Sequence, residues 1–310
     1  MGSILSLSVV ISALELGVIY ALIALALFLS YSILNIADLS TDGCFTLGCA
    51  VGAQVAMMGH PVLALFAAMA AGVCSGYIMA FLQTKLGVES ILAGIIVNTG
   101  LYTVNLAVMG FSANLSIFKT DTIYSLCKDL FGTTMYKLAV SVIIVLIVCV
   151  ILAWFLGTRL GLSIRATGDN ADMVRASSIN PGFTITVGLC ISGSMTALAG
   201  CLIGQYQKSC DINMGTGMVT IALASLIIGE TLIGKGSIPR RILGVILGSC
   251  LYRFVIAIAL RLHVPAECLK LVSALIVAVA IASPYLKRRI AFQKRKMAAA
   301  SARKGGNGTC

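Results

Sequence analysis

The sequence predicts an all-α protein, a polytopic bundle of transmembrane helices, and three observations support that prediction. Of the 310 residues, 59% are hydrophobic and only 11% are charged. The mean hydropathy is +1.03, above that of ordinary soluble domains. Apolar runs such as "SVIIVLIVCVILAWFLG" are continuous, without the polar and apolar alternation of a membrane β-barrel. Because lipid offers the backbone no hydrogen-bond partner, such runs must be helices.

Apolar runs of about 20 residues, the length that crosses the hydrocarbon core, follow one another along most of the chain. The first run has no Lys or Arg before it and no clear small-residue cleavage site after it, so we interpret it as a span and not as a removable signal peptide. We expect about nine spans. They lie near 7–34, 41–58, 61–83, 89–110, 137–157, 183–206, 217–234, 242–262 and 266–286.

Basic residues set the expected orientation. The net charge of +11 is concentrated in the tail, 287–310, which contains no acidic residue. A polybasic segment after a span is typical of the cytoplasmic side, where it meets anionic lipid, so the charge needs no nucleic-acid partner. With the tail inside, the N-terminus lies outside, and the basic loops 84–88, 158–182 and 235–241 also lie inside.

Catalytic and metal-binding motifs are missing from the sequence. The chain has eleven cysteines without a CxxC pair, and two histidines far apart, so we expect no metal site and no enzyme active site. The stretch "GETLIGKGS" nearly matches a phosphate-binding loop, but Gly236 stands where that loop needs a hydroxyl. We therefore expect this chain to bind no cofactor and no nucleotide.

Small residues recur at helical spacing inside the spans. A Gly-xxx-Gly pair gives a helix a flat surface against which another backbone packs closely. Packing within one chain is the favoured interpretation, and a dimer seam is the alternative. The pairs are Gly48/Gly52, Gly72/Gly76, Gly200/Gly204 and Gly244/Gly248.

One stretch, "GLSIRATGDNADMVRASSINPG" at 161–182, is polar and rich in turn residues within this apolar chain. Its middle predicts a short helix with Gly168 or Asp169 at the N-cap, Asn170 and Asp172 in the first turn, and "INPG" as its end. From composition alone, a solvated loop is the favoured alternative.

The longer stretch "GLSIRATGDNADMVRASSINPGFTITVGLCISGSMTALAGCL" resembles the coupling segment of the branched-chain amino acid/ribose-type family of ABC importer permeases. Ser178 departs from the family pattern, which more often has Gly before Ile179. The resemblance implies that 159–181 seats in a cleft of an ATP-binding subunit. The expected contact residues are Arg165, Ala166, Gly168, Asp169, Asn170, Arg175 and Ala176.

A second stretch, "NIADLSTDGCFTLGC" at 35–49, resembles the family's break between early spans. Such breaks are tolerated where the backbone is buried or lines a cavity. A purely structural turn is the alternative. The segment 205–217 weakly repeats the pattern on the opposite face of the expected topology, as an inverted repeat would. The expected translocation path contains Asp38, Ser40, Asp42, Gly43, Asn98, Asp211 and Asn213.

Three charged residues, Glu15, Glu230 and Arg253, fall inside expected spans. An unpaired charge there costs at least about 2.5 kcal/mol, so we expect such residues to face the bundle interior or water. Glu15 and Arg253 are expected to pair, with contact to a zwitterionic solute as the alternative, and Glu230 is expected near the inner interface. Asn98 and Asn105 share a helix face and either join helices or line the path.

The resemblance implies a permease subunit of a bacterial ABC importer in the inner membrane, with a transmembrane permease domain at 1–286 and a cytoplasmic tail at 287–310. It implies three kinds of partner: cytoplasmic ABC ATPase subunits that hold ATP and Mg, an extracytoplasmic substrate-binding (lipo)protein, and a second permease chain. The favoured second chain is another copy of this one, which gives a homodimer. The expected solute is small and polar, with an amino acid as the first candidate. Within the family, the sequence most resembles the branch of aromatic amino acid permeases. An ion-gradient-driven transporter using Glu15 and Glu230 is the alternative.

Overall fold

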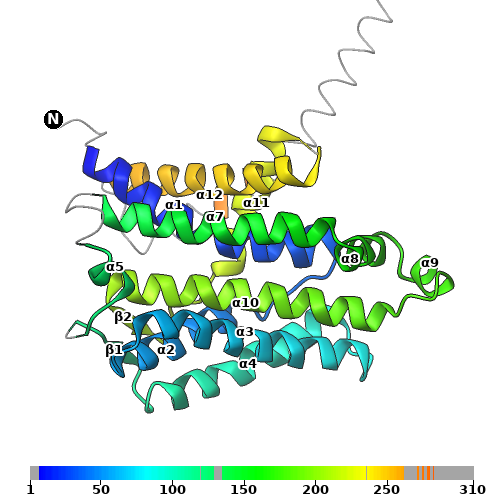
Figure 1. Ribbon diagram of the computed structural model, residues 1–310, viewed down its shortest axis with the longest axis horizontal. Coiled ribbons are helices and arrows are strands. Elements are labelled where there is room, and N and C mark those ends of the chain that lie inside the picture. Colours follow the sequence, from blue (N-terminus) through cyan, green and yellow to red (C-terminus); the bar gives the residue numbers. More distant parts are fainter. Residues whose placement is uncertain are drawn as a thin grey trace, which may run out of the picture.

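The computed structural model describes residues 7–118, 120–128, 135–234 and 236–261, together with 271, 274, 275, 278, 279 and 282. This part of the chain is a helical bundle with one small sheet (Figure 1). Its main helices are α1 (Leu7–Leu27), α2 (Thr41–Met57), α3 (Pro61–Thr84), α4 (Ser90–Val108), α7 (Tyr136–Gly157), α10 (Pro181–Gln207), α11 (Met218–Ile233) and α12 (Ile238–Arg261). The shorter ones are the π-helix η1 (Phe28–Ile33), α5 (Ile123–Leu126), α8 (Arg159–Asp169) and α9 (Ala171–Ala176).

The described part of the chain is mostly helical, as predicted, but it also contains a short two-stranded sheet, and the count of nine spans is not reproduced. Within the described residues, 6 helices are long and apolar enough to cross a membrane. The expected spans 41–58 and 217–234 correspond to the shorter helices α2, of 17 residues, and α11, of 16 residues. The expected span 266–286 falls almost wholly outside the described residues, and the tail 287–310 lies entirely outside them.

Helix α10 forms the centre of the bundle and packs against α1, α2 and α3 (Figure 1). The backbones approach so closely that a Cβ added to Gly48 would lie 2.0 Å from the Ala197 carbonyl oxygen. A Cβ on Gly72 would lie 2.3 Å from the Gly193 oxygen. The glycines of all four Gly-xxx-Gly pairs face other helices of the same chain, which confirms the prediction of packing within one chain.

Helix α2 begins inside the bundle, not at its surface. It runs in the same direction as α10, because Gly48 faces Ala197 and Gly52 faces Cys201, four residues further on in each helix. This register sets Thr41 level with Cys190. At 1.5 Å per residue, α2 therefore begins about 14 Å along α10 from Pro181. The preceding residues 35–40 form the break that the sequence indicated.

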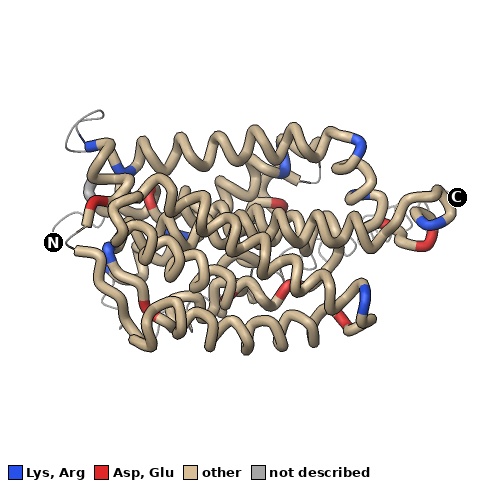
Figure 2. The backbone as a smooth tube through the Cα atoms, turned by 60° about the horizontal axis from the view of Figure 1, so that its bottom comes forward, with Lys and Arg blue, Asp and Glu red and all other residues tan. Residues whose placement is uncertain are grey.

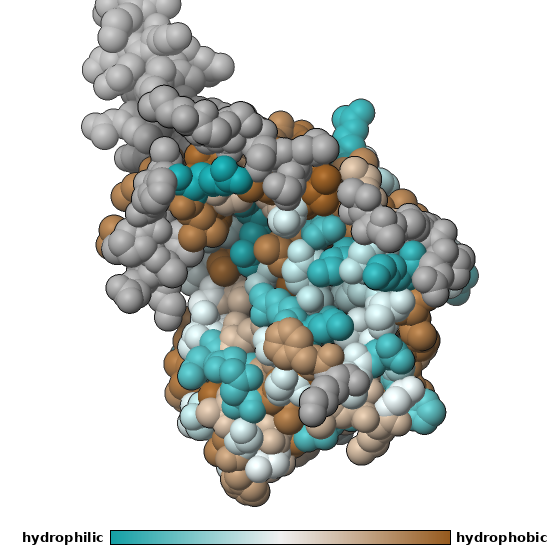
Figure 3. All heavy atoms as spheres, turned by 90° about the vertical axis from the view of Figure 1, so that its left-hand side faces the viewer, coloured by the Kyte–Doolittle hydropathy of each residue, from teal (hydrophilic) through white to brown (hydrophobic). Residues whose placement is uncertain are grey.

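The two ends of the bundle differ. One end carries α5 and a two-stranded antiparallel sheet, in which β1 (Asn114–Ser116) pairs with β2 (Ser209–Asp211). Hydrophilic side chains gather over this end (Figure 3). The opposite end carries α8 and α9, and α9 projects beyond the other helices (Figure 1). Charged residues concentrate at both ends, with few along the middle (Figure 2), as expected for a bundle that crosses a bilayer.

Candidate functional site

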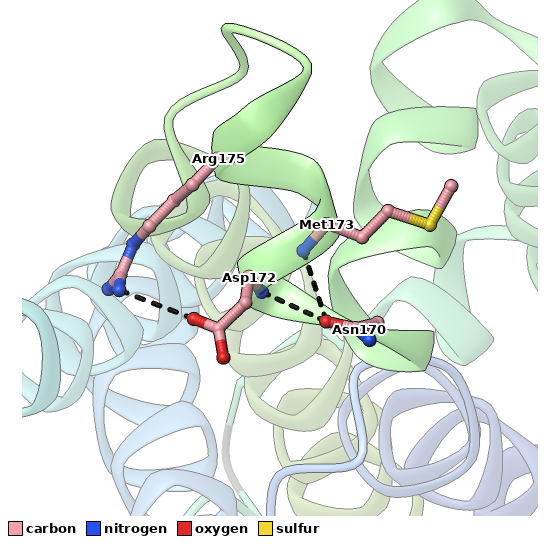
Figure 4. A network of polar contacts seen from close by, with 4 residues as sticks. All are labelled: Asn170, Asp172, Met173 and Arg175. Atoms are coloured by element: carbon pink, nitrogen blue, oxygen red, sulfur yellow. Dashed lines mark hydrogen bonds and ion pairs between the residues drawn. The ribbon is translucent and has the colours of Figure 1, made fainter.

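The polar segment 161–182 contains most of helix α8 and all of helix α9, which Asn170 separates. The Asn170 side-chain oxygen accepts hydrogen bonds from the backbone N–H groups of Asp172 and Met173, each at 3.0 Å (Figure 4). The expectation that Gly168 or Asp169 is the N-cap is wrong. Asn170 takes that position because its extended backbone, with φ −160° and ψ 103°, interrupts the helix, while α8 continues through Asp169.

Helix α8 is fixed to the bundle along one side. Its buried residues are Gly161, Ile164 and Thr167, and the Thr167 hydroxyl lies 2.8 Å from the Thr184 hydroxyl on α10. Gly168 packs so closely against the end of η1 that a Cβ there would lie 1.8 Å from the Ile33 carbonyl oxygen. Gly168 is therefore a packing residue between α8 and η1, not part of an exposed contact face.

The other predicted residues of the segment are exposed. Arg165, Ala166, Asp169, Asn170, Arg175 and Ala176 all point to solvent. The neighbouring Met173 is 69% exposed. Arg175 and Asp172 form an exposed ion pair at 3.5 Å (Figure 4), which contributes little to stability. The tip thus presents Met173 and several charged side chains to solvent.

Ser178 ends the segment with a left-handed backbone, φ 61°. The turn is closed by backbone hydrogen bonds from Ser178 to Arg175 at 3.1 Å and from Ile179 to Val174 at 3.2 Å. Glycine adopts this conformation without the steric cost that Ser has. This conformation is the physical reason why a glycine suits the position.

The break at 35–40 follows η1 and holds a buried carboxylate. Asn35 ends the helix with φ 57°. Asp38 is 6% exposed, and its Oδ1 atom accepts hydrogen bonds from the Ser40 backbone N–H at 2.8 Å and the Ser40 hydroxyl at 2.6 Å. Asp38 and Ser40, both predicted for the translocation path, therefore lie together inside the bundle, and each provides a hydrogen-bond partner for the other.

The Asp42 carboxylate joins the starts of two helices. It belongs to the first turn of α2, yet it accepts hydrogen bonds from the backbone N–H groups of Gly217 and Val219, both at 2.9 Å, at the start of α11. A carboxylate at a helix N-terminus is stabilised by the helix dipole. The segments 35–43 and 205–217 were expected on opposite faces, whereas their ends meet here. From this point α2 runs toward the sheet end and α11 toward the α8 end.

The remaining path candidates divide into two places. Gly43 faces α4, where the Asn105 side-chain amide donates to the Gly43 carbonyl at 3.0 Å, and a Cβ on Gly43 would lie 2.7 Å from Asn98 Oδ1. These contacts join α2 to α4. Asp211 and Asn213 lie apart from Asp38, at the sheet end, where Asp211 accepts from the Asn213 N–H at 2.8 Å.

The expected ion pair between Glu15 and Arg253 is wrong. Within the described residues, no side-chain nitrogen and oxygen of these two lie within 4.0 Å. Glu15 is 6% exposed and accepts a hydrogen bond from the Tyr206 hydroxyl at 2.7 Å. The Arg253 guanidinium instead stacks over the Tyr20 ring, with 3.5 Å between its carbon and the ring centroid. Both residues lie on helices of the bundle, and each charge has a neutral aromatic partner.

Glu230 belongs to a cluster that the sequence did not indicate. Its carboxylate pairs with Arg241 at 2.6 Å and accepts from the Ser32 hydroxyl at 2.9 Å, while Arg241 also contacts Ser32 at 2.5 Å. The Arg241 guanidinium lies 4.8 Å from the Phe28 ring centroid. The cluster thus joins η1, α11 and α12. The expected loop 235–241 contained Arg241, but no local spacing relates it to Ser32, 209 residues away.

Comparison with known proteins identifies the family. A family model described as the permease component of the branched-chain amino acid transport system matches residues 9–281. The chain belongs to this family. The permease is 33% identical over 272 residues to the tyrosine transport system permease protein of Clostridioides difficile (strain R20291), covering 87% of this chain and 90% of that one. The resemblance inferred from the polar segment and the break is thereby confirmed.

Sugar permeases are also related to this permease. The D-allose transport system permease protein of Escherichia coli (strain K12) is 33% identical over 220 residues, covering 67% of this chain and 63% of that one. The autoinducer 2 import system permease protein of Yersinia pseudotuberculosis serotype O:3 (strain YPIII) is 26% identical over 229 residues, covering 71% and 60%. No solved structure matches the permease.

Family membership establishes the broad function. The permease is a component of a binding-protein-dependent ABC transport system, and it is the transport component and not a catalytic subunit. Together with the apolar helices, the family indicates a multi-pass integral membrane protein of the bacterial inner membrane. ATPase and binding-protein partners are general to the family.

Proposed function

We propose that this permease imports an amino acid by ATP-driven alternating access, with a cytoplasmic ATPase subunit seated on the tip formed by α8 and α9. The observation that carries the proposal is the construction of this tip. Its outer side presents Arg165, Asp169, Met173 and Arg175 to solvent, while its inner side is fastened to the bundle by Thr167 and Gly168. A partner that moves the tip therefore moves the helices behind it.

A continuous series of contacts leads from the tip to the centre of the bundle. Gly168 packs on Ile33 at the end of η1, and the chain from Ile33 leads through the buried break to Asp42. Asp42 holds the start of α11 through two hydrogen bonds. From Asp42, α2 runs toward the sheet end of the bundle and α11 runs toward the α8 end. A displacement of η1 would therefore act on one helix that leads to each end. Discontinuous helices of this kind line the pathway in many transporters.

The proposed assembly follows the asymmetry of the two ends. The α8 end faces the cytoplasm and the ATPases, which bind ATP and Mg. The sheet end faces outward and receives solute from an extracytoplasmic binding protein. A second permease chain, most simply another copy of this one, completes the pathway.

The proposed solute class, an amino acid with tyrosine as the first candidate, is supported by the tyrosine transport system permease, which resembles this chain over most of both lengths. A sugar is the alternative, because the D-allose permease has the same 33% identity over a shorter region. Uptake of labelled tyrosine and of labelled D-allose by proteoliposomes with the complete assembly distinguishes the two. Competition by phenylalanine but not by D-allose is the expected result.

An ion-gradient-driven transporter is the rival function, and it requires carboxylates that exchange a proton or a cation during transport. The two candidates are already engaged, since Glu230 pairs with Arg241 and Glu15 accepts from Tyr206. This arrangement favours the ATP-driven function.

The decisive experiment is co-purification of the permease with candidate ATPase subunits, measuring complex yield and stimulated ATP hydrolysis. The double variant Asp169→Arg with Arg175→Glu changes two exposed charges of the tip and should lose both readouts while remaining folded. The matched control is Asp121→Arg with Lys128→Glu, two exposed charges at the sheet end, which should behave as wild type. If no ATPase associates even with the wild type, the ion-driven function replaces the proposal.

A further inference from the structure

A groove between the end of α3 and the start of α10 has the composition of a binding site for an amphiphile. Its cavity has a volume of about 280 Å³. Its lining is of two kinds, polar and basic side chains on the one hand and aromatic side chains on the other. The polar group is Thr84, Lys85, Asn180 and Thr186, and the aromatic group is Tyr77, Phe81 and Phe183.

Along α3 the two kinds of lining follow the helix axis. Lys85 lies just past the last residue of α3, and Tyr77 lies eight residues earlier, about 12 Å deeper along the helix. Asn180 is the N-cap of α10 and directly follows the tip formed by α8 and α9. Along α3 the groove is therefore basic and polar at the α8 end and aromatic toward the middle of the bundle, the order in which a lipid of that leaflet presents its headgroup and its acyl chains. Along α10, Phe183 lies near Asn180, and Thr186 lies about 9 Å deeper than Asn180.

Local hydrogen bonds indicate which headgroup fits. Asn180 Oδ1 accepts from the Gly182 N–H at 2.9 Å, which leaves the amide nitrogen as the donor toward a ligand. Thr84 donates its hydroxyl hydrogen to the Ala80 carbonyl at 2.8 Å, and Thr186 donates to the Gly182 carbonyl at 2.7 Å. These two hydroxyls therefore act as acceptors. Lys85 and Asn180 suit a phosphate, and the threonine oxygens suit headgroup hydroxyls.

The aromatic walls are open to the surroundings of the bundle. Tyr77 is 54% exposed, Phe81 43% and Phe183 55%. Large aromatic side chains that line a groove with an ammonium group at one end, near the membrane surface, meet lipid and not water.

We propose that this groove binds an anionic glycerophospholipid with a hydroxylated headgroup, of the phosphatidylglycerol type. Its phosphate lies against Lys85 and Asn180, a headgroup hydroxyl donates to Thr84, and an acyl chain lies along Tyr77, Phe81 and Phe183. Because Asn180 joins the tip to α10, the bound lipid fixes the inner end of α10. That this leaflet is the cytoplasmic one rests on the proposed function, whereas the binding itself does not.

The test is lipid binding by the purified full-length chain in detergent, followed by native mass spectrometry. The probes are phosphatidylglycerol, phosphatidylcholine and inorganic phosphate. Wild type should retain phosphatidylglycerol preferentially. Lys85→Gln should weaken its retention roughly fivefold, about the contribution of one basic residue near a lipid surface. Lys85→Arg should retain it, and Lys128→Gln at the sheet end should have no effect. Phosphatidylcholine retention should be unchanged in all variants.

A second variant separates lipid from free phosphate and guards against a folding defect. Phe183→Ala removes one acyl wall and leaves the cation, so it should weaken phosphatidylglycerol but not inorganic phosphate. Equal retention of the two phospholipids by wild type would overturn the proposal. So would full phosphatidylglycerol binding by a folded Lys85→Gln variant, or displacement of the lipid by millimolar phosphate. If Lys85→Gln does not fold, loss of phosphatidylglycerol from wild type at high salt supports the proposal, and salt-insensitive retention contradicts it. None of these outcomes depends on ATPase docking.

Discussion

Ser178 and Gly168 lie ten residues apart and meet opposite constraints. Ser178 has a side chain at a backbone angle, φ 61°, that favours glycine. Gly168 is an ordinary helical residue whose missing side chain makes room for the Ile33 carbonyl. The first position concerns the backbone conformation of the chain itself, and the second concerns the distance to another segment. Substitutions at the two positions should therefore affect different properties.

At position 178, Ser178→Gly should leave the apparent thermal midpoint in detergent unchanged or raise it, because the left-handed conformation no longer carries a steric cost. Ser178→Val should lower the stability by about 1–2 kcal/mol, because a β-branched residue is poorly tolerated there. The neighbouring Ser177 has φ −88°, so Ser177→Val is the matched control and should shift the midpoint much less. Equal effects of valine at 177 and 178 would contradict the backbone explanation.

At position 168, Gly168→Ala should weaken transport more than it weakens ATPase binding. The added methyl group would lie 1.8 Å from a backbone oxygen of η1, so α8 must shift away from Ile33 while the exposed face of the tip is retained. The measurements are complex yield with the ATPase and uptake per ATP hydrolysed in proteoliposomes. Gly157→Ala is the matched control, because a Cβ added to Gly157, the last residue of α7, has nothing within 4 Å. Wild-type uptake by Gly168→Ala would show that the contact with η1 does not transmit motion.

At the scale of elements, one polar cluster holds together the end of η1, the end of α11 and the start of α12. Glu230 and Arg241 have side chains that are only 17% and 19% exposed, and Ser32 contacts both of them. Charges this far from water are expensive without a partner, so each depends on the other. The cluster fixes the position of η1, the same element that Gly168 contacts.

The cluster predicts that substitutions at Glu230 and Arg241 have non-additive effects on stability. Glu230→Gln should lower the stability by about 1–3 kcal/mol, because the Arg241 guanidinium loses its counter-charge in a largely buried place. The double variant Glu230→Gln with Arg241→Met should be less destabilised than the sum of the two single variants. Thermal unfolding in detergent of the four proteins in this cycle gives the coupling energy. Strictly additive changes would mean that the pair does not join α11 to α12.

At the scale of the whole molecule, the bundle is built on the close contact of α2 and α3 with α10. Glycines at this contact bring backbone against backbone, and van der Waals packing of this kind is the main force that holds helices together in lipid. Large side chains point outward, as Trp154 does at 73% exposure, toward the lipid. In the proposed mechanism, this tight centre would couple a movement of η1 to both α2 and α10.

The close packing at the centre of the bundle predicts that alanine is poorly tolerated at Gly48 but well tolerated at Gly100. Gly48→Ala places a Cβ 2.0 Å from the Ala197 oxygen and should reduce the yield of folded, monodisperse protein, with a cost of at least about 1–3 kcal/mol. Gly100 on α4 has nothing within 4 Å of its added Cβ, so Gly100→Ala should be neutral or slightly stabilising through its better helix propensity. Size-exclusion profiles and thermal midpoints measure both. A tolerated Gly48→Ala would contradict the close packing of α2 on α10.

Composition and local patterns were enough for the membrane class, the helical architecture, the family, the intrachain packing of the Gly-xxx-Gly pairs, and the two breaks in the apolar pattern. Each of these depends on the transfer of residues to lipid or on helical spacing, which a linear sequence displays. The cap at Asn170 was one position beyond the predicted pair, because all three residues can cap a helix and only the backbone angle selects one.

The contacts between distant segments came from the three-dimensional arrangement alone. Asp42 accepts from residues 175 and 177 positions away, Ser32 meets Arg241 across 209, and Glu15 meets Tyr206 across 191. The sequence shows that a buried charge needs a partner, but it does not show which of several polar side chains lies within reach. Glu15 and Arg253 have opposite charges and lie on helices in contact, α1 and α12, yet each has an aromatic partner. The choice depends on the rotation and register of packed helices, which follow from the summed contacts of the whole bundle.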